Sequence, residues 1–522
     1  MKKEKVVVIG AGPAGLAAAY ELLKNSKKYE VTVLEESEFI GGISRTVYYK
    51  GNNFDIGGHR FHTRIPVVEK WWEEILPLQG APSYDDKKLS RDGVTKKGGP
   101  DPEKEDGVLL RRNRLSRIFF KNKFFDYPVS LSAKTIKNMG LGTTFVVGCS
   151  FLKSRIHRCP EKSLEDYYIN QFGRKLYEMF FEDYTENLWG RHPRDISPEY
   201  GLERVHDEIS VLKMLKDLMI GVAKKKEKEI DEFDYPKLGP GQMWEMVAKK
   251  IEEKGGKIVF GAKVLGVNIG GDNKISVVRY ISGDKEKKVA ADYVVSSMPL
   301  KDLVMGMDVA PEEIRTIAKD LPYRDYIMVG VLTDGMKIKN KTKIKTLGDI
   351  IPDEWVYVHE KNVKMGRLQI FNNWSPYLVA DPENRVLMGV EYFCDEGDKM
   401  WQMKDSDLEK MAISEMREVG IIMDDTKVID AVVIRLKKAY PAYFDSYARI
   451  DDLKDYLDKI PNLYCVGRNG RHCYSDLDYS ICSSFEAAKN IIDGNKTKKN
   501  IWNSQNLKKY AQKNSKNTEI RR

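Results

Sequence analysis

The feature that most constrains the fold is a glycine motif near the N-terminus, in the segment VVVIGAGPAGLAAAYELLK (residues 6–24). It places G-x-G-x-x-G at Gly10, Gly12 and Gly15, directly after an apolar strand and directly before an Ala- and Leu-rich helix. Gly10 permits a tight turn, Gly12 lets a pyrophosphate approach the backbone, and Gly15 lets the helix pack closely on the strand. The helix N-terminus would hold the anion. The motif therefore predicts a dinucleotide-binding α/β unit.

The next predicted strand, VTVLE (residues 31–35), ends in Glu35, twenty residues after Gly15. A carboxylate at this point accepts hydrogen bonds from the ribose hydroxyls of an adenosine and disfavours a 2′-phosphate. These features alone leave FAD and NAD open.

Two later glycine pairs favour FAD. Gly41 and Gly42 lie in FIGGISRT, and Gly57 and Gly58 lie in FDIGGHRFHT. They bring the backbone repeatedly close to a bulky ligand, and an NAD-binding fold seldom continues in this way.

A segment near the C-terminal end completes the predicted FAD site. Residues 463–492 predict a strand, a glycine turn and a long helix beginning near Asp478, whose N-terminus would face the pyrimidine end of the flavin. Arg468 would pair with the pyrophosphate. The predicted FAD-binding residues are Gly10, Gly12, Pro13, Ala14, Gly15, Glu35, Glu36, Gly41, Gly42, Ile43, Ser44, Gly57, Gly58, His59, Val264, Gly467, Arg468, Asp476, Leu477 and Asp478.

The strand-like runs are dispersed along the chain, and 522 residues exceed what one hydrophobic core usually supports. The expected fold class is therefore α/β, with a discontinuous Rossmann-like FAD-binding domain and a mixed α+β substrate domain. The expected segments are 1–75, 236–304 and 446–494 for FAD binding, 109–235 (helical) and 305–445 (mixed sheet) for the substrate domain, 81–108 as an exposed insertion loop, and 495–522 as a basic tail.

The charge distribution and the spacing of the cysteines mainly exclude classes of protein. The net charge is +9, but residues 496–522 contribute +8, so the body is not expected to bind nucleic acid. We expect the tail to be solvated, with contact to an anionic membrane surface as the alternative.

No apolar run is long enough to span a bilayer, and six cysteines without CxxC spacing fit a reducing cytoplasm. No metal site is predicted, and the oligomeric state stays open between monomer and homo-oligomer.

Five motifs resemble those of a known family: FDIGGHRFHT (54–63), DYTENLWG (183–190), ISPEYGLERV (196–205), KAYPAYFDSY (438–447) and VGRNGRHCYSDLD (466–478). Together they resemble the UDP-galactopyranose mutases, within the flavoprotein superfamily of amine oxidases, protoporphyrinogen oxidases and desaturases. The likeness runs from residue 5 to about 494 with gaps. Mutases usually have GRLG followed by a tyrosine, a basic residue and a tyrosine. Here GRNG is followed by Arg471, His472, Cys473 and Tyr474, so the identity of the substrate is open.

The resemblance implies an FAD-dependent enzyme of polysaccharide biosynthesis that interconverts the pyranose and furanose forms of a UDP-sugar through a reduced-flavin covalent adduct, with NAD(P)H as a transient reductant. The implied catalytic residues are His59, His62, Arg204, Tyr474 and Asp476. The implied substrate-binding residues are Tyr184, Trp189, Arg204, Arg324, Tyr440, Tyr443 and Tyr474.

Two other functions fit the same motifs. One is an oxidoreductase of the amine oxidase, protoporphyrinogen oxidase or desaturase type, which transfers hydride from its substrate to FAD. The other is a non-catalytic flavoprotein. The mutase is favoured because a hydride-accepting oxidase has no evident need for an arginine clamp on a diphosphate.

Overall fold

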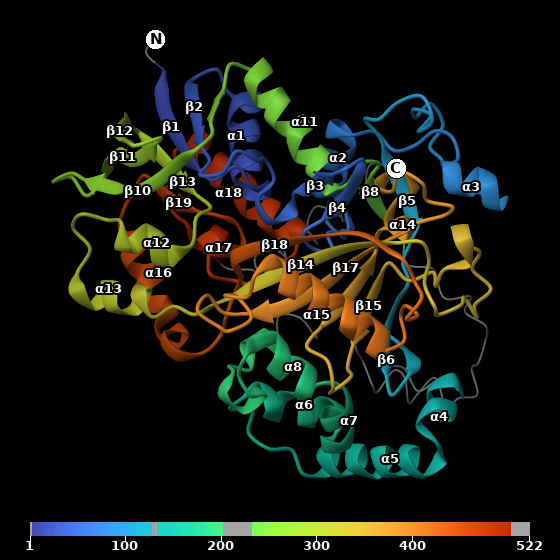
Figure 1. The fold of residues 1–522 in the computed structure, drawn as a ribbon. Helices are drawn as coiled ribbons and strands as arrows, with labels where there is room; N and C mark the ends of the chain where they lie inside the picture. Colours follow the sequence, from blue (N-terminus) through green and yellow to red (C-terminus); the bar gives the residue numbers. More distant parts are fainter. Residues whose placement is uncertain (1–2, 128, 130–132, 202–231, 503–522) are drawn as a thin grey trace, which may run out of the picture.

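The computed structural model describes residues 3–127, 129, 133–201 and 232–502, and Figure 1 shows their arrangement. Arg204, a helix predicted to begin near Glu208 and the basic tail beyond Trp502 lie outside the described residues.

A five-stranded parallel sheet, in the order β19-β13-β1-β2-β9, carries the glycine motif. In β1 both alternating sets of side chains are buried, with Val6 and Val8 on one face and Val7 and Ile9 on the other. Burial on both faces is typical of a parallel sheet covered on both sides. The strands are β1 (Glu4–Ile9), β2 (Tyr29–Leu34), β9 (Lys257–Val259), β13 (Tyr293–Ser296) and β19 (Leu463–Cys465).

Helices cover one face of this sheet, where α1 lies between α11 and α18 (Figure 1). A three-stranded antiparallel sheet and α12 share a core with the opposite face. These elements are α1 (Pro13–Asn25), α11 (Pro240–Glu253), α18 (Leu477–Asp493), β10 (Ala262–Ile269), β11 (Ile275–Ser282), β12 (Lys285–Ala290), α12 (Leu300–Met305), α13 (Glu312–Lys319) and α16 (Ile450–Asp458).

A seven-stranded mixed sheet, in the order β18-β14-β17-β16-β15-β6-β7, forms the second part of the molecule. One face of β14 packs under α15 through Ile327 and Val329, while Tyr326 and Met328 point to the other core. Its elements are β6 (Ser116–Phe120), β7 (Lys123–Asp126), β14 (Tyr323–Thr333), β15 (Trp355–Val358), β16 (Arg367–Ile370), β17 (Val386–Cys394), β18 (Val428–Pro441) and α15 (Asp405–Glu418).

A group of helices lies below this sheet in Figure 1, with α5 at its outer edge. It comprises α4 (Ala133–Met139), α5 (Leu141–Ile156), α6 (Leu164–Phe172), α7 (Arg174–Phe180) and α8 (Glu182–Trp189). The remaining elements are β3 (Thr46–Tyr49), β4 (Asn52–Asp55), α2 (Pro66–Ile75), α3 (Tyr84–Leu89), β5 (Leu109–Asn113), β8 (Glu232–Pro236), α14 (Phe371–Trp374), α17 (Gly467–Gly470) and α19 (Lys499–Trp502). Within the described ranges, no helix has the length and hydropathy of a membrane span.

The α/β fold class predicted from the sequence is confirmed, because strands from four distant segments assemble into one parallel sheet. Two regions differ from the sequence prediction. Residues 109–126, expected to be helical, form β5, β6 and β7. These strands are only four or five residues long, and segments this short carry no period that separates a buried strand from a helix.

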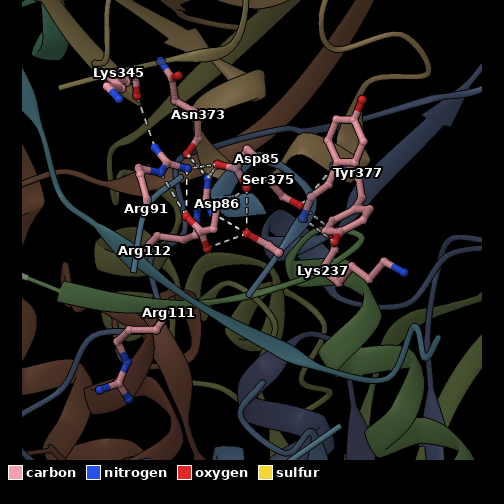
Figure 2. A network of polar contacts seen from close by, with 12 residues as sticks. Asp85, Asp86, Arg91, Arg111, Arg112, Lys237, Lys345, Asn373, Ser375 and Tyr377 are labelled. Atoms are coloured by element: carbon pink, nitrogen blue, oxygen red, sulfur yellow. Dashed lines mark hydrogen bonds and ion pairs between the residues drawn. The ribbon is translucent and has the colours of Figure 1, made fainter. Parts of the chain in front are cut away.

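Residues 81–108, expected to form an exposed loop, contain α3 and a buried group of ion pairs (Figure 2). The carboxylate of Asp85 is 2.6 Å from Arg112 of β5 and also pairs with Arg91. The Ser83 hydroxyl lies 2.7 Å from both Asp85 and Asp86. Opposite charges distant in sequence thus satisfy one another, and this lets a charged segment pack inside the molecule.

Candidate active site

A cavity of about 480 Å³ opens at the carboxyl edge of the parallel sheet. This edge, where strands β1, β2, β13 and β19 end, is where open α/β sheets bind their ligands. Fourteen of the predicted FAD-binding residues line the cavity: Gly10, Gly12, Pro13, Ala14, Glu35, Glu36, Gly42, Ile43, Ser44, His59, Val264, Gly467, Arg468 and Leu477.

The glycines shape the floor of this cavity. Gly10 has a φ of +95°, which favours glycine, and a Cβ on Gly15 would lie 1.9 Å from the carbonyl oxygen of Gly10. A Cβ on Gly12, in contrast, would meet nothing nearer than the Cα of Gly42 at 3.9 Å. The missing side chain at Gly12 therefore keeps the cavity open for a ligand and does not serve close packing within the protein. No side chain caps the N-terminus of α1, so this space and the helix amides fit a pyrophosphate.

Glu35 is held at the edge of the cavity by donors from the glycine turn and from its own loop. Its carboxylate accepts hydrogen bonds from the backbone N–H of Ala11 at 2.7 Å and from the N–H and hydroxyl of Ser37 at 3.0 and 2.7 Å. These bonds fix the carboxylate where a ribose can reach it.

A second cavity, of about 190 Å³, adjoins the first. Ile43, His59, Arg468 and Leu477 line both cavities. A ligand that fills the first cavity therefore reaches the second at this junction. The remaining lining of the second cavity is basic and aromatic, and its side chains include Arg60, His62, Arg114, Tyr127, Phe233, Tyr326, Trp355, Tyr357, Arg367, Tyr440 and Tyr474, with Glu232 and Asp476 as the acids.

His59 lies at the junction in its neutral form. Burial, with the neighbouring charges of Arg468 and Arg367, lowers the pKa of His59 to about 4. Its Nδ1 is 3.0 Å from the carbonyl oxygen of Gly57, a contact that requires a proton on Nδ1 and leaves Nε2 as an acceptor. His62 lies at the rim, with Nδ1 3.2 Å from the carbonyl oxygen of Glu232.

The second cavity carries positive charge that its surroundings do not neutralise. Among the described residues, no carboxylate forms an ion pair with Arg60 or Arg468. Arg60 donates to the hydroxyl of Ser116 at 2.6 Å, and its guanidinium lies 5.7 Å from the centre of the Trp355 ring. Burial raises the pKa of the nearby Glu354 to about 8, so this carboxyl is largely protonated at pH 7. The cavity is therefore suited to an anion.

Two tyrosines form an aromatic wall beside these arginines. The rings of Tyr440 and Tyr474 stack with their centres 5.9 Å apart, and Arg468 lies 4.6 Å from the centre of the Tyr474 ring. Arg367 donates to the hydroxyl of Tyr440 at 3.0 Å. The hydroxyl of Tyr443 accepts the backbone N–H of Tyr474 at 2.6 Å, so Tyr443 positions this wall from behind.

Several residues predicted to bind substrate lie outside both cavities. Trp189 is buried against Tyr200, with ring centres 4.9 Å apart. Tyr184 stacks on His359 and meets Tyr357 of the cavity wall edge to face, with ring centres 5.8 Å apart. Arg324 is the clearest correction, because its guanidinium donates to the carbonyl oxygens of Leu188 and Asn187 at the end of α8 and pairs with Asp395 at 2.5 Å.

Some predicted cofactor residues also take other positions. Gly57, Gly58 and Asp476 line the second cavity rather than the first. Asp478 is buried in the first turn of α18, where it accepts a hydrogen bond from the Thr63 hydroxyl at 2.8 Å, and burial beside Asp476 raises its pKa to about 7. Gly15 and Gly41 line neither cavity.

Distant elements contribute further lining residues that were not predicted from the sequence. Ser297, Met298 and Pro299 follow β13, and their position after a parallel strand was a usable signal. Lys438 has a φ of +53° at a bulge of β18 and reaches Asp302 of α12 at 2.6 Å, across the first cavity. Nothing in its local sequence indicates this position. In the part of the chain that the structure describes, no cluster of three or more His, Cys, Asp or Glu residues suits a metal ion.

Comparisons with known proteins agree with this geometry. A protein-family model described as flavin containing amine oxidoreductase matches residues 13–492. The solved structure of a reduced UDP-galactopyranose mutase is similar, with a TM-score of 0.73 and 19% identity over 96% of this chain and 98% of that chain. A putrescine oxidase bound to putrescine has a TM-score of 0.58 and 14% identity over 94% of this chain and 99% of that chain. At these identities the likeness shows the fold.

Among curated proteins, the L-amino-acid oxidase of Crotalus adamanteus is 25% identical over 296 residues, which is 56% of this chain and 50% of that protein. The chain thus spans about half the length of the first curated relatives that it matches.

Proposed function

Because the chain belongs to the family of flavin containing amine oxidoreductases and its cofactor is FAD, we propose that it is a sugar-nucleotide mutase that interconverts the pyranose and furanose forms of a UDP-sugar. One observation carries the proposal: the cavity that adjoins the FAD cavity is lined by Arg60, Arg114, Arg367 and Arg468, of which Arg60 and Arg468 have no acidic partner among the described residues.

This lining matches the leaving group of such a reaction. When UDP departs from the anomeric carbon, negative charge develops on its diphosphate, and arginine forks bind phosphate oxygens in pairs. Fixed cations that face a dry cavity stabilise that charge without reorganising. Arg60 and Arg468 are placed for this role by Ser116 and by the carbonyl oxygen of Ser475, which Arg468 contacts at 3.0 and 3.1 Å.

The aromatic residues suit the sugar. Tyr440 and Tyr474 present stacked rings to the cavity, and a sugar ring packs its C–H face against such surfaces while its hydroxyls reach phenolic oxygens. The volume of about 190 Å³ is below the roughly 300–1,000 Å³ typical of small-molecule pockets, so the cavity would take the sugar and the adjoining phosphate rather than a whole sugar nucleotide.

Reduced FAD supplies a nucleophile in such a reaction and is recovered unchanged, so the net reaction is an isomerisation. The neutral His59 would accept a hydrogen bond through Nε2 at the junction of the two cavities. Because His59 is neutral, the positive charge that faces the leaving group comes from the arginines. Arg204, which the resemblance assigns to the diphosphate, is outside the described residues.

A second function has its own support. The matched relatives include L-amino-acid oxidases, and the carboxylate of an amino acid would also bind to an arginine-lined cavity. In that case FAD would accept hydride from the substrate, and reduced cofactor would have to be reoxidised in every turnover. A simple cationic amine is disfavoured by the same positive lining.

The number of product molecules formed for each flavin reduced distinguishes the mutase from the oxidase. The protein is reduced anaerobically with a limited amount of dithionite and incubated with UDP-galactose, and the ring forms are separated by chromatography. The mutase predicts many molecules of isomerised UDP-sugar for each flavin reduced, with no product from the oxidised protein. If no UDP-sugar is isomerised and an amino acid instead bleaches the oxidised flavin under nitrogen, the oxidase is correct and the mutase proposal is wrong.

A further inference from the structure

Helix α5 presents an apolar stripe to the outside of the molecule. Leu141, Phe145, Leu152 and Ile156, which we call the α5 stripe, are 82%, 73%, 60% and 75% exposed. With 3.6 residues per turn, these four positions lie within about 60° of one another around the helix axis. Large apolar side chains gathered so closely on one exposed face mark an interaction site.

The opposite face of α5 accounts for its packing within the molecule. Val147, Phe151 and Ser154 are buried on the side that faces α6 and α7. The α5 stripe is therefore not needed to hold the helix in place. A Cβ on Gly142 or Gly148 would meet no atom within 4 Å, and α5 lies at the outer edge of its helical group (Figure 1).

The charged residues within the segment that contains the stripe are all basic, and two of them, Lys134 and Arg158, pair with Asp126 and Glu161 just outside it. Residues 127–160 contain no Asp or Glu, and their basic residues are Lys134, Lys137, Lys153, Arg155 and Arg158. Lys153 and Arg155 flank the α5 stripe, one on each side of the helix. Neither has an acidic partner among the described residues. Lys153 is exposed, whereas Arg155 is half-buried, lies 5.0 Å from the centre of the Phe151 ring and donates to the carbonyl oxygen of Gln171 at 3.5 Å. A helix with one apolar face and basic flanks is typical of proteins that lie on anionic membranes.

We propose that the α5 stripe, with Lys153 and Arg155, docks the protein on an anionic lipid bilayer, with α5 lying in the plane of the headgroups. The apolar side chains enter the boundary between headgroups and acyl chains, and the basic side chains contact lipid phosphates. A second copy of the chain is a poorer partner, because two such helices face to face would oppose like charges. The inference rests on this surface alone and is independent of the reaction that the enzyme performs.

Vesicle sedimentation with the full-length, FAD-loaded protein tests the proposal. We expect binding to vesicles of phosphatidylcholine and phosphatidylglycerol, weaker binding when the ionic strength is raised, and little binding to phosphatidylcholine alone. The double variant F145S/L152S should bind the anionic vesicles at least about tenfold more weakly than the wild type. Its melting temperature should be unchanged, because both side chains are exposed. The matched control is V309S/M423S, which replaces two apolar side chains that are 58% and 46% exposed outside α5. It should bind like the wild type.

Cys149, an exposed residue beside the α5 stripe, reports which segment touches the lipid. An environment-sensitive fluorophore on Cys149, with C149S as the labelling blank, should shift to the blue when the anionic vesicles are added.

Three results would overturn the proposal. Vesicle binding without a shift at Cys149, and equal in F145S/L152S, would assign the contact to the basic tail. A dimer seen by sedimentation equilibrium without lipid, and lost in F145S/L152S, would assign the stripe to a second copy. A label that is already blue-shifted without vesicles and does not respond to them would mean that another part of the chain covers the stripe.

Discussion

Gly12 and Gly15 belong to one motif but have different roles, Gly12 in binding FAD and Gly15 in packing. Substitution of each by alanine distinguishes the two roles. A Cβ on Gly12 meets only the Cα of Gly42 at 3.9 Å, whereas a Cβ on Gly15 would lie 1.9 Å from a backbone oxygen. We expect G12A to fold with the melting temperature of the wild-type apoprotein. Its affinity for FAD should be at least about tenfold lower than that of the wild type. G15A should lower the melting temperature of the apoprotein itself. Flavin fluorescence titration and thermal unfolding give the two readouts, and equal effects of both variants would contradict this division.

Arg60 combines a functional charge with a cost in stability. It is enclosed by Trp355, Trp374 and Phe233 and has no acidic partner among the described residues. Arg60 is half-buried, and the desolvation of its charge is not offset by a carboxylate, so an apolar side chain of similar length should cost little stability. R60M should therefore keep or raise the melting temperature, while kcat/KM for the UDP-sugar falls by about 10²-fold, as for the loss of one charge-stabilising donor. A variant with normal kcat/KM and reduced stability would show that Arg60 is structural.

His472 makes stability depend on pH. It is 1% exposed, and burial lowers its pKa from 6.5 to about 4. Because the unfolded chain then binds more protons, stability is lost as the pH falls from about 6.5 to about 4, by up to about 3 kcal/mol. H472N retains a residue that tolerates the φ of +47° and removes this titration. Urea unfolding at several pH values should show a smaller loss in H472N than in the wild type, and parallel losses would contradict the assignment.

At the scale of elements, Arg324 completes the C-terminus of α8. Its guanidinium serves the carbonyl oxygens of Asn187 and Leu188 and pairs with Asp395. Loss of these donors leaves buried acceptors unsatisfied, at about 1–3 kcal/mol for each buried group. R324Q should therefore lower the free energy of unfolding by about 2–3 kcal/mol and leave the KM for the UDP-sugar unchanged. A raised KM at normal stability would instead support the diphosphate role that the sequence suggested.

The elements that the sequence predicted best are those whose signals are local. β1, α1 and β2 follow one another in 31 residues; the glycine motif marks the turn after β1, and Glu35 directly follows β2. The substrate side has no such signal, because Arg60, Trp355 and Arg367 come from segments about 300 residues apart and meet only in the folded chain. Arg60 lies between His59 and His62, so its presence in the site could have been anticipated. Trp355 and Arg367 are ordinary strand residues by sequence.

At the scale of the whole molecule, the active site lies where the two sheets meet. The parallel sheet contributes the FAD cavity, and the seven-stranded sheet contributes Tyr326, Trp355, Arg367 and Tyr440 to the second cavity. His59 and Arg468 line both cavities, so they lie at the junction of the FAD cavity and the proposed substrate cavity. Both the mutase and the oxidase would need this junction.

The most direct test of the junction is a titration of the purified protein with a UDP-sugar, followed in the absorbance spectrum of its flavin. We predict a yellow protein whose flavin bands shift saturably as the UDP-sugar binds, with the shift lost in R60M and retained in R324Q. A protein without flavin bands that FAD cannot restore, or one that binds the UDP-sugar by calorimetry while its flavin spectrum stays unchanged, would contradict the account.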